Sequence, residues 1–144
     1  MQVRYEIGNE HSPTDHSGRF RLDLDADGAL RVEHRSWEGP VRAWTASAGP
    51  SLRYKLGRVL GAAGFPAPPA LPPPPPGSRM RALTVSGTPD GSVLLPARDA
   101  AEVPGYAEVF ALLDGLLAQL SGRALPGAAD PDPAVTAIRE TAPE

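Results

Sequence analysis

The clearest chemical spacing in the chain belongs to three aspartates that precede a glycine. Asp23, Asp25 and Asp27, followed by Gly28, match the pattern that begins an EF-hand calcium loop, where carboxylates at alternate positions surround the ion. The twelfth position of such a loop supplies a bidentate glutamate, and here it is His34. The pattern therefore predicts a hairpin turn, with a calcium- or metal-dependent binding module at these aspartates as an alternative.

A second set of residues has the composition of a protein-binding hot spot. Trp37 and Trp44 lie close together in a chain with only 6% aromatic residues, and Arg42 and Tyr54 are near them in sequence. Tryptophan, tyrosine and arginine dominate the binding energy of many protein interfaces. These four residues are therefore a candidate partner-binding site, and the alternative is that the tryptophans fill the core.

Motifs for catalysis are missing from the sequence. The chain has no cysteine, which excludes disulfides and thiolate chemistry. It contains no Gly-x-Ser-x-Gly elbow, no phosphate-binding Walker loop and no His-Glu-x-x-His zinc motif. We therefore assign no catalytic residue and no cofactor, and a small enzyme of unrecognised type remains only an alternative.

Alternating and helical periodicities indicate the elements that would hold these residues. Apolar residues alternate with polar ones around a turn at Asp27-Gly28 and around a second turn at residues 87–91, which predicts two hairpins. Two amphipathic segments, 50–65 and 104–120, have apolar residues at helical spacing. Gly115 inside the second segment weakens a helix, so we expect another part of the chain to pack closely there.

These elements predict an α+β fold with one shared core. We expect an antiparallel sheet of four to five strands, including the two hairpins, with two helices packed on one face. Residues 1–122 should form a single domain, with the proline-rich stretch 66–77 as a rigid crossover inside it. Residues 123–144 are rich in Pro, Ala and Asp, and should form a tail with a short terminal helix from Asp132 to Glu140 as one possibility.

Composition limits the classes of partner. The formal net charge is −3, which does not favour nucleic-acid binding. No apolar run approaches the roughly 20 residues of a membrane-spanning helix, and the beginning of the chain alternates like a strand rather than a secretion signal. We therefore expect a cytoplasmic protein without membrane contact. Lys55 is the only lysine among 14 basic residues, which is typical of a GC-rich bacterial genome.

A family resemblance supports a non-enzymatic role. The helix end Leu56-x-x-Val59-Leu60-Gly-Ala-Ala-Gly64-Phe65-Pro66, the strand Arg81-Ala-Leu83-Thr-Val85 and the leucine-rich final helix resemble the emfourins, small bacterial inhibitors of thermolysin-like metalloproteases. The resemblance extends roughly from Phe20 to Leu120. It implies a protein that acts by binding another protein, and no inhibitory residue motif is matched.

The residues and the resemblance together favour one functional class. We expect a non-enzymatic protein-interaction module, of inhibitor or immunity type, whose partner is another protein of unknown identity.

Overall fold

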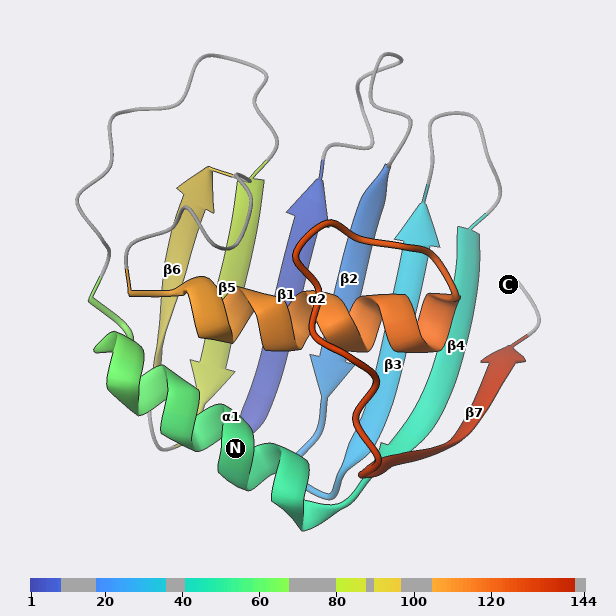
Figure 1. The fold of residues 1–144 in the computed structure, drawn as a ribbon, viewed down its shortest axis with the longest axis horizontal. Coiled ribbons are helices and arrows are strands. Elements are labelled where there is room, and N and C mark those ends of the chain that lie inside the picture. Colours follow the sequence, from blue (N-terminus) through green and yellow to red (C-terminus); the bar gives the residue numbers. More distant parts are fainter. Residues whose placement is uncertain (9–17, 36–40, 68–79, 88–89, 97–104, 142–144) are drawn as a thin grey trace.

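The fold is an antiparallel sheet covered on one side by two helices (Figure 1). A computed structural model describes residues 1–8, 18–35, 41–67, 80–87, 90–96 and 105–141. In chain order the elements are β1 (Gln2–Gly8), β2 (Arg19–Leu24), β3 (Ala29–Arg35), β4 (Val41–Ala48), α1 (Pro50–Ala63), β5 (Met80–Ser86), β6 (Gly91–Pro96), α2 (Ala107–Ser121) and β7 (Val135–Thr141). The predicted α+β class and the two helices are confirmed. The residues expected in the proline-rich crossover, 66–77, lie outside the described residues from position 68 onward.

The sheet has seven strands in the order β6-β5-β1-β2-β3-β4-β7, so the expectation of four to five strands is wrong. Strand β7 occupies most of the segment for which a terminal helix was considered, and it pairs with β4. Of its seven residues only Val135 is buried. A strand at the border of a sheet with so little burial lacks the apolar alternation by which strands are recognised in sequence.

The first hairpin forms as its turn residues predict. Gly28 has a φ of +94°, which glycine adopts readily, and its N–H donates to the carbonyl oxygen of Asp25 at 3.1 Å. A side chain at Gly28 would also meet the carbonyl oxygen of Ala48, since an added Cβ atom would lie 2.5 Å from it. Gly28 thus serves the turn and the close approach of β4.

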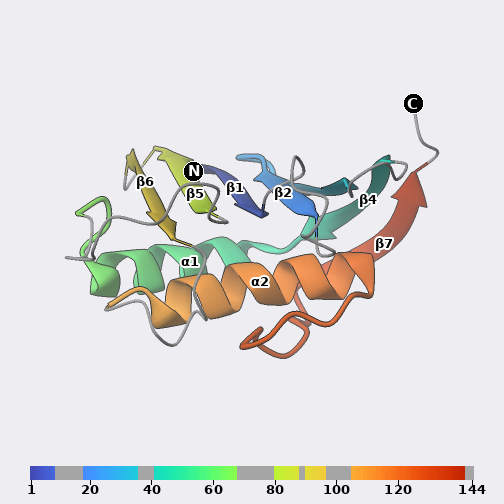
Figure 2. The same ribbon diagram turned by 90° about the horizontal axis from the view of Figure 1, so that it is seen from above.

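Both helices pack on the same face of the sheet. Helix α2 crosses the middle of the strands, and α1 runs obliquely across their lower ends in Figure 1 (Figures 1 and 2). The core between the two layers takes alternate residues of the strands and one side of each helix, such as Leu22, Val32, Leu56 and Phe110. Helix α1 ends in a left-handed Gly64 with a bond from the Phe65 N–H to the Leu60 carbonyl, the Schellman ending that the sequence indicates.

The segment between α2 and β7 lies across the outer side of α2 and explains the glycine in that helix (Figure 1). The Ala129 N–H donates to the Ala111 carbonyl at 2.9 Å, and a Cβ atom at Gly115 would lie 2.9 Å from the Ala129 carbonyl oxygen. The expected close approach at Gly115 is therefore confirmed. Gln119 exchanges two hydrogen bonds with the backbone of Asp132, each 3.0 Å long, which holds the same segment further along.

Candidate functional site

Neither of the two described helices lies on the other face of the sheet, which we call the open face (Figure 2). Successive side chains of a strand point to opposite faces, and residues directly opposite each other on paired strands share a face. The apolar residues point to the helices. The residues between them form the open face, which spans all seven strands through one continuous set of pairings, for example Ser92, Thr84, Arg4, Asp23, Arg31, Thr45 and Arg139.

Arginines dominate the charges of the open face. Among its described residues six are arginine and three are carboxylates: Arg4, Arg19, Arg21, Arg31, Arg35 and Arg139 against Glu6, Asp23 and Glu33. The chain as a whole has a formal charge of −3. The open face is therefore positive although the protein is acidic overall.

Ion pairs within strands and between neighbouring strands hold these side chains in an alternating pattern of positive and negative charge. Asp23 accepts from Arg4 Nε at 2.9 Å with one carboxylate oxygen and from Arg21 Nε at 3.1 Å with the other. Arg31 donates to Glu33 at 3.1 Å. The hydrogen bond to Asp23 also raises the pKa of Arg4. Exposed pairs of this kind contribute little to stability, about 0–1 kcal/mol each, but they limit the positions that the guanidinium groups adopt.

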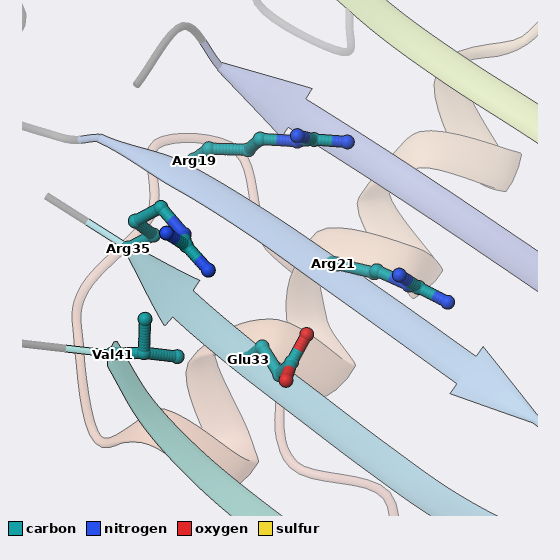
Figure 3. Close-up of a pocket in the computed structure, with 5 residues that line it drawn as sticks. All are labelled: Arg19, Arg21, Glu33, Arg35 and Val41. Carbon is teal, nitrogen blue, oxygen red and sulfur yellow. The ribbon is translucent and has the colours of Figure 1, made fainter. Parts of the chain in front are cut away.

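A shallow hollow lies where the arginines are most concentrated (Figure 3). It has a volume of about 120 Å³ and is lined by Arg19, Arg21, Glu33, Arg35 and Val41. Arg19 and Arg35 stand directly opposite each other on β2 and β3. Like charges in directly opposed positions destabilise a sheet. Arg19 also donates to Glu6 of β1, which compensates part of this charge. Three arginines and one carboxylate line the hollow, and this local excess of positive charge is suited to binding a carboxylate or another anion.

The residues predicted as a partner-binding site do not form one patch. Trp44 is 5% exposed and belongs to the core, so its side chain fills the interior as in the alternative interpretation. The guanidinium of Arg42 lies 5.1 Å from the centre of the Trp44 ring and makes a bidentate pair with Glu140 at 2.8 and 3.0 Å. Tyr54 is 81% exposed on α1, whereas Arg42 lies at the opposite end of β4 from the end that leads into α1. Trp37 lies outside the described residues.

The three aspartates predicted as a metal site have separate surroundings. Asp23 uses both oxygens in ion pairs on the open face. Asp25 and Asp27 are exposed in the turn, and Asp27 accepts a 3.3 Å hydrogen bond from the Ala29 N–H. The part of the chain that the structure describes contains no group of three or more His, Cys, Asp or Glu side chains placed to hold a metal ion.

A buried polar cluster that no sequence pattern indicated joins α2 to the sheet. Arg81 of β5 donates to both oxygens of Asp114 at 2.9 and 3.1 Å, and the Tyr5 hydroxyl donates to the same carboxylate at 2.7 Å. Burial raises the pKa of Tyr5 well above its ordinary value, and Asp114 adds to this effect. Burial alone would lower the pKa of Arg81, but its two partners raise it. All three side chains are under 5% exposed, so the cluster connects elements and is closed to a ligand.

Sequence reasoning recognised the arginines of the open face only as outward residues of separate strands. Their alternation with apolar residues was visible, but the order of the strands was not. The pairing of β2 with both β1 and β3 is what places Arg19, Arg21 and Arg35 together.

Comparison with known proteins adds no assignment. Neither a scan against known protein families nor a search of curated proteins found a match. Within the described residues, no helix is long and apolar enough to cross a bilayer.

Proposed function

We propose that this protein is a non-enzymatic interaction module that binds an acidic surface of another protein through the open face of its sheet. The observation that carries the proposal is the excess of arginine on this face, six against three carboxylates, in a chain with a formal charge of −3. Complementary charge favours encounter with the correct partner and disfavours others.

The pattern of charges favours a protein partner over a nucleic acid. Glu6, Asp23 and Glu33 alternate with the arginines, and they would meet the phosphates of a nucleic acid with like charge. The described residues of the open face include no aromatic side chain on which a base could stack. A protein surface that offers both carboxylates and basic groups matches such a mosaic better.

Inhibitor and immunity proteins are the specific roles we favour within this class. Both act by stoichiometric binding, and the resemblance to the emfourins supports the inhibitor role. That role predicts that the purified protein suppresses peptide hydrolysis by a thermolysin-like protease at equimolar concentration. Undiminished hydrolysis would exclude the role of a thermolysin inhibitor. The proposal that the open face binds an acidic protein surface is tested separately by the binding experiment.

The binding experiment compares charge reversals on the open face with a charge reversal on helix α1. Proteins from the source cells are captured with the wild-type chain, with the Arg21→Glu and Arg35→Glu double variant, and with an Arg58→Glu control on α1. The proposal predicts a partner that the wild type and the control retain and the double variant loses. Calorimetry with that purified partner should show an affinity at least about tenfold weaker for the double variant, and a steep fall in affinity with salt.

Three outcomes would refute the proposal. The first is a partner that binds the double variant as tightly as the wild type. The second is an equal loss of binding in the Arg58→Glu control, which would indicate a general effect of charge. The third is tighter binding of duplex DNA or RNA than of any captured protein, which would point to a nucleic-acid partner.

A further inference from the structure

The two outer strands of the sheet differ in their protection against pairing with another chain. Strand β7 carries Arg139 and Glu140, and its pairing with β4 shifts register between Thr45 and Ser47. Within that irregularity Ala137 has a φ of +57°. Charges and bulges are the features by which natural sheets prevent their outer strands from pairing with further strands.

Strand β6 at the other border has neither a charge nor a bulge, and its protective feature is the proline at its end, Pro96. Its sequence, Gly-Ser-Val-Leu-Leu-Pro, contains no charge, and its pairing with β5 is regular. Val93 and Leu95 are buried against the helices, while Leu94 on the open face is 65% exposed. The neighbouring open-face residues of β5 that flank it, such as Ala82 and Thr84, are also uncharged.

We propose that β6 pairs with β6 of a second copy of this chain and joins the two sheets into one. Antiparallel pairing about a two-fold axis perpendicular to the sheet requires that opposed residues share a face. An axis at Leu94 satisfies this condition, because it places Leu94 opposite Leu94 of the second copy and Val93 opposite Leu95. The exposed leucine then packs against its own counterpart.

Pro96 at the end of the strand leaves this register possible but removes one donor from each copy. Proline occurs in an outer strand where its missing N–H points away from the neighbouring strand. Pro96 shares its alternation with Ser92 and Leu94, so the backbone groups of these two residues face the free side of β6. Among the described residues, these groups are therefore available to bond to the second copy. Leu94 exchanges two hydrogen bonds with its counterpart, and the Ser92 N–H donates to the Pro96 carbonyl of the second copy, which has no N–H to donate in return.

The charges near β6 and the different protection of β6 and β7 together favour a second copy of this chain as the partner that pairs with β6. The contact region is uncharged on both sides, so self-association meets no repulsion, although the open faces beyond it are positive. Because β7 is protected by charges and a bulge and β6 only by its terminal proline, β6 is the border that can pair, and association closes as a dimer instead of continuing as a fibre. The perpendicular axis also keeps both open faces on the same side of the joined sheet.

The experiment measures molar mass by light scattering coupled to size-exclusion chromatography, from micromolar to millimolar concentration. The wild-type chain should approach twice its monomer mass of 15.1 kDa. Leu94→Lys and Leu94→Glu should each be monomeric, because each places two like charges together on the axis. An equimolar mixture of the two variants should regain the dimer mass, since lysine then meets glutamate. Ile138→Lys, at the 42% exposed apolar residue of β7, is the matched control and should remain dimeric.

Circular dichroism of each variant shows whether the fold is retained, and Leu94 is exposed enough for both substitutions to be tolerated. A wild-type chain that stays at the monomer mass overturns the proposal. So does a Leu94→Lys variant that remains dimeric, or an Ile138→Lys variant that becomes monomeric. Recovery of the dimer in the lysine and glutamate mixture is the result that a general loss of stability would not produce.

Discussion

Removal of the Asp114 carboxylate should destabilise the protein more than removal of any exposed carboxylate. In the structure Asp114 accepts from Arg81 and from Tyr5 beneath α2, and its side chain is 2% exposed. Asp114→Ala leaves the Arg81 charge in a low-dielectric interior without its carboxylate partner. Loss of one partner from a buried ion pair costs about 3–5 kcal/mol.

A second variant separates the cost of an unpaired charge from the value of the ion pair itself. Arg81→Met combined with Asp114→Leu removes both charges and keeps apolar volume. Buried pairs replaced in this way often lose little stability. The Tyr5 hydroxyl would then lack these two partners, at a cost of about 1–3 kcal/mol, and adding Tyr5→Phe should recover most of that cost.

Urea unfolding followed by fluorescence of the two tryptophans measures each free energy, and Asp25→Ala at an exposed turn position is the control. We expect the ranking of destabilisation to be Asp114→Ala, then the double variant, then the triple variant, with the control within about 0.5 kcal/mol of the wild type. The reasoning fails if Asp114→Ala costs less than about 1 kcal/mol, or if the double variant is less stable than Asp114→Ala.

Three further predictions address the outer segment and the turn. Gly115→Ala should lower the free energy of unfolding by about 1–3 kcal/mol, because the added methyl group meets the Ala129 backbone. Gly61→Ala, with open space around it, should raise the free energy of unfolding by up to about 1 kcal/mol. Urea unfolding measures both, and the opposite ranking of the two variants would contradict the close approach at Gly115. Burial alone would raise the pKa of Asp132, but hydrogen bonds from a lysine and a backbone N–H lower it, so its stabilisation is complete above about pH 4 and is lost as the pH falls through the folded pKa. The stability difference between wild type and Asp132→Asn should therefore shrink from pH 7 to pH 3, and a constant difference would be inconsistent with this linkage. Calcium should leave the melting temperature unchanged, and a rise that Asp25→Asn abolishes would instead support the metal-binding alternative.

Local signals in the sequence were sufficient for much of the fold. Gly28 predicted the first hairpin because a tight turn requires a φ that glycine adopts freely, and Gly64 predicted the end of α1 for the same reason. Gly115 predicted a close approach without indicating its source. Strand β7 was missed because its residues are almost all exposed, and hydrogen bonding to β4 defines it instead.

The candidate site was less accessible to sequence reasoning. Trp44 and Arg42 were candidates for a partner-binding surface, with core packing of the tryptophan as the alternative. The tryptophan is buried, and the arginine pairs with Glu140, which lies far away along the chain. Composition identified residue types that bind partners, but burial decided which of them remain available.

The sequence by itself determined the class of fold, the two helices and the outward direction of the arginines on β1, β2 and β3, because these depend on periodicity and on neighbours close in the chain. The tertiary structure decided which arginines share a surface, since that depends on strand order and register across distant segments. It also decided that Tyr5, Arg81 and Asp114 meet in the core, and that β7 rather than β4 forms one border of the sheet. Pairings between distant segments are not visible in the local sequence pattern, because the same residue types form the same strand or helix whichever segment they later contact.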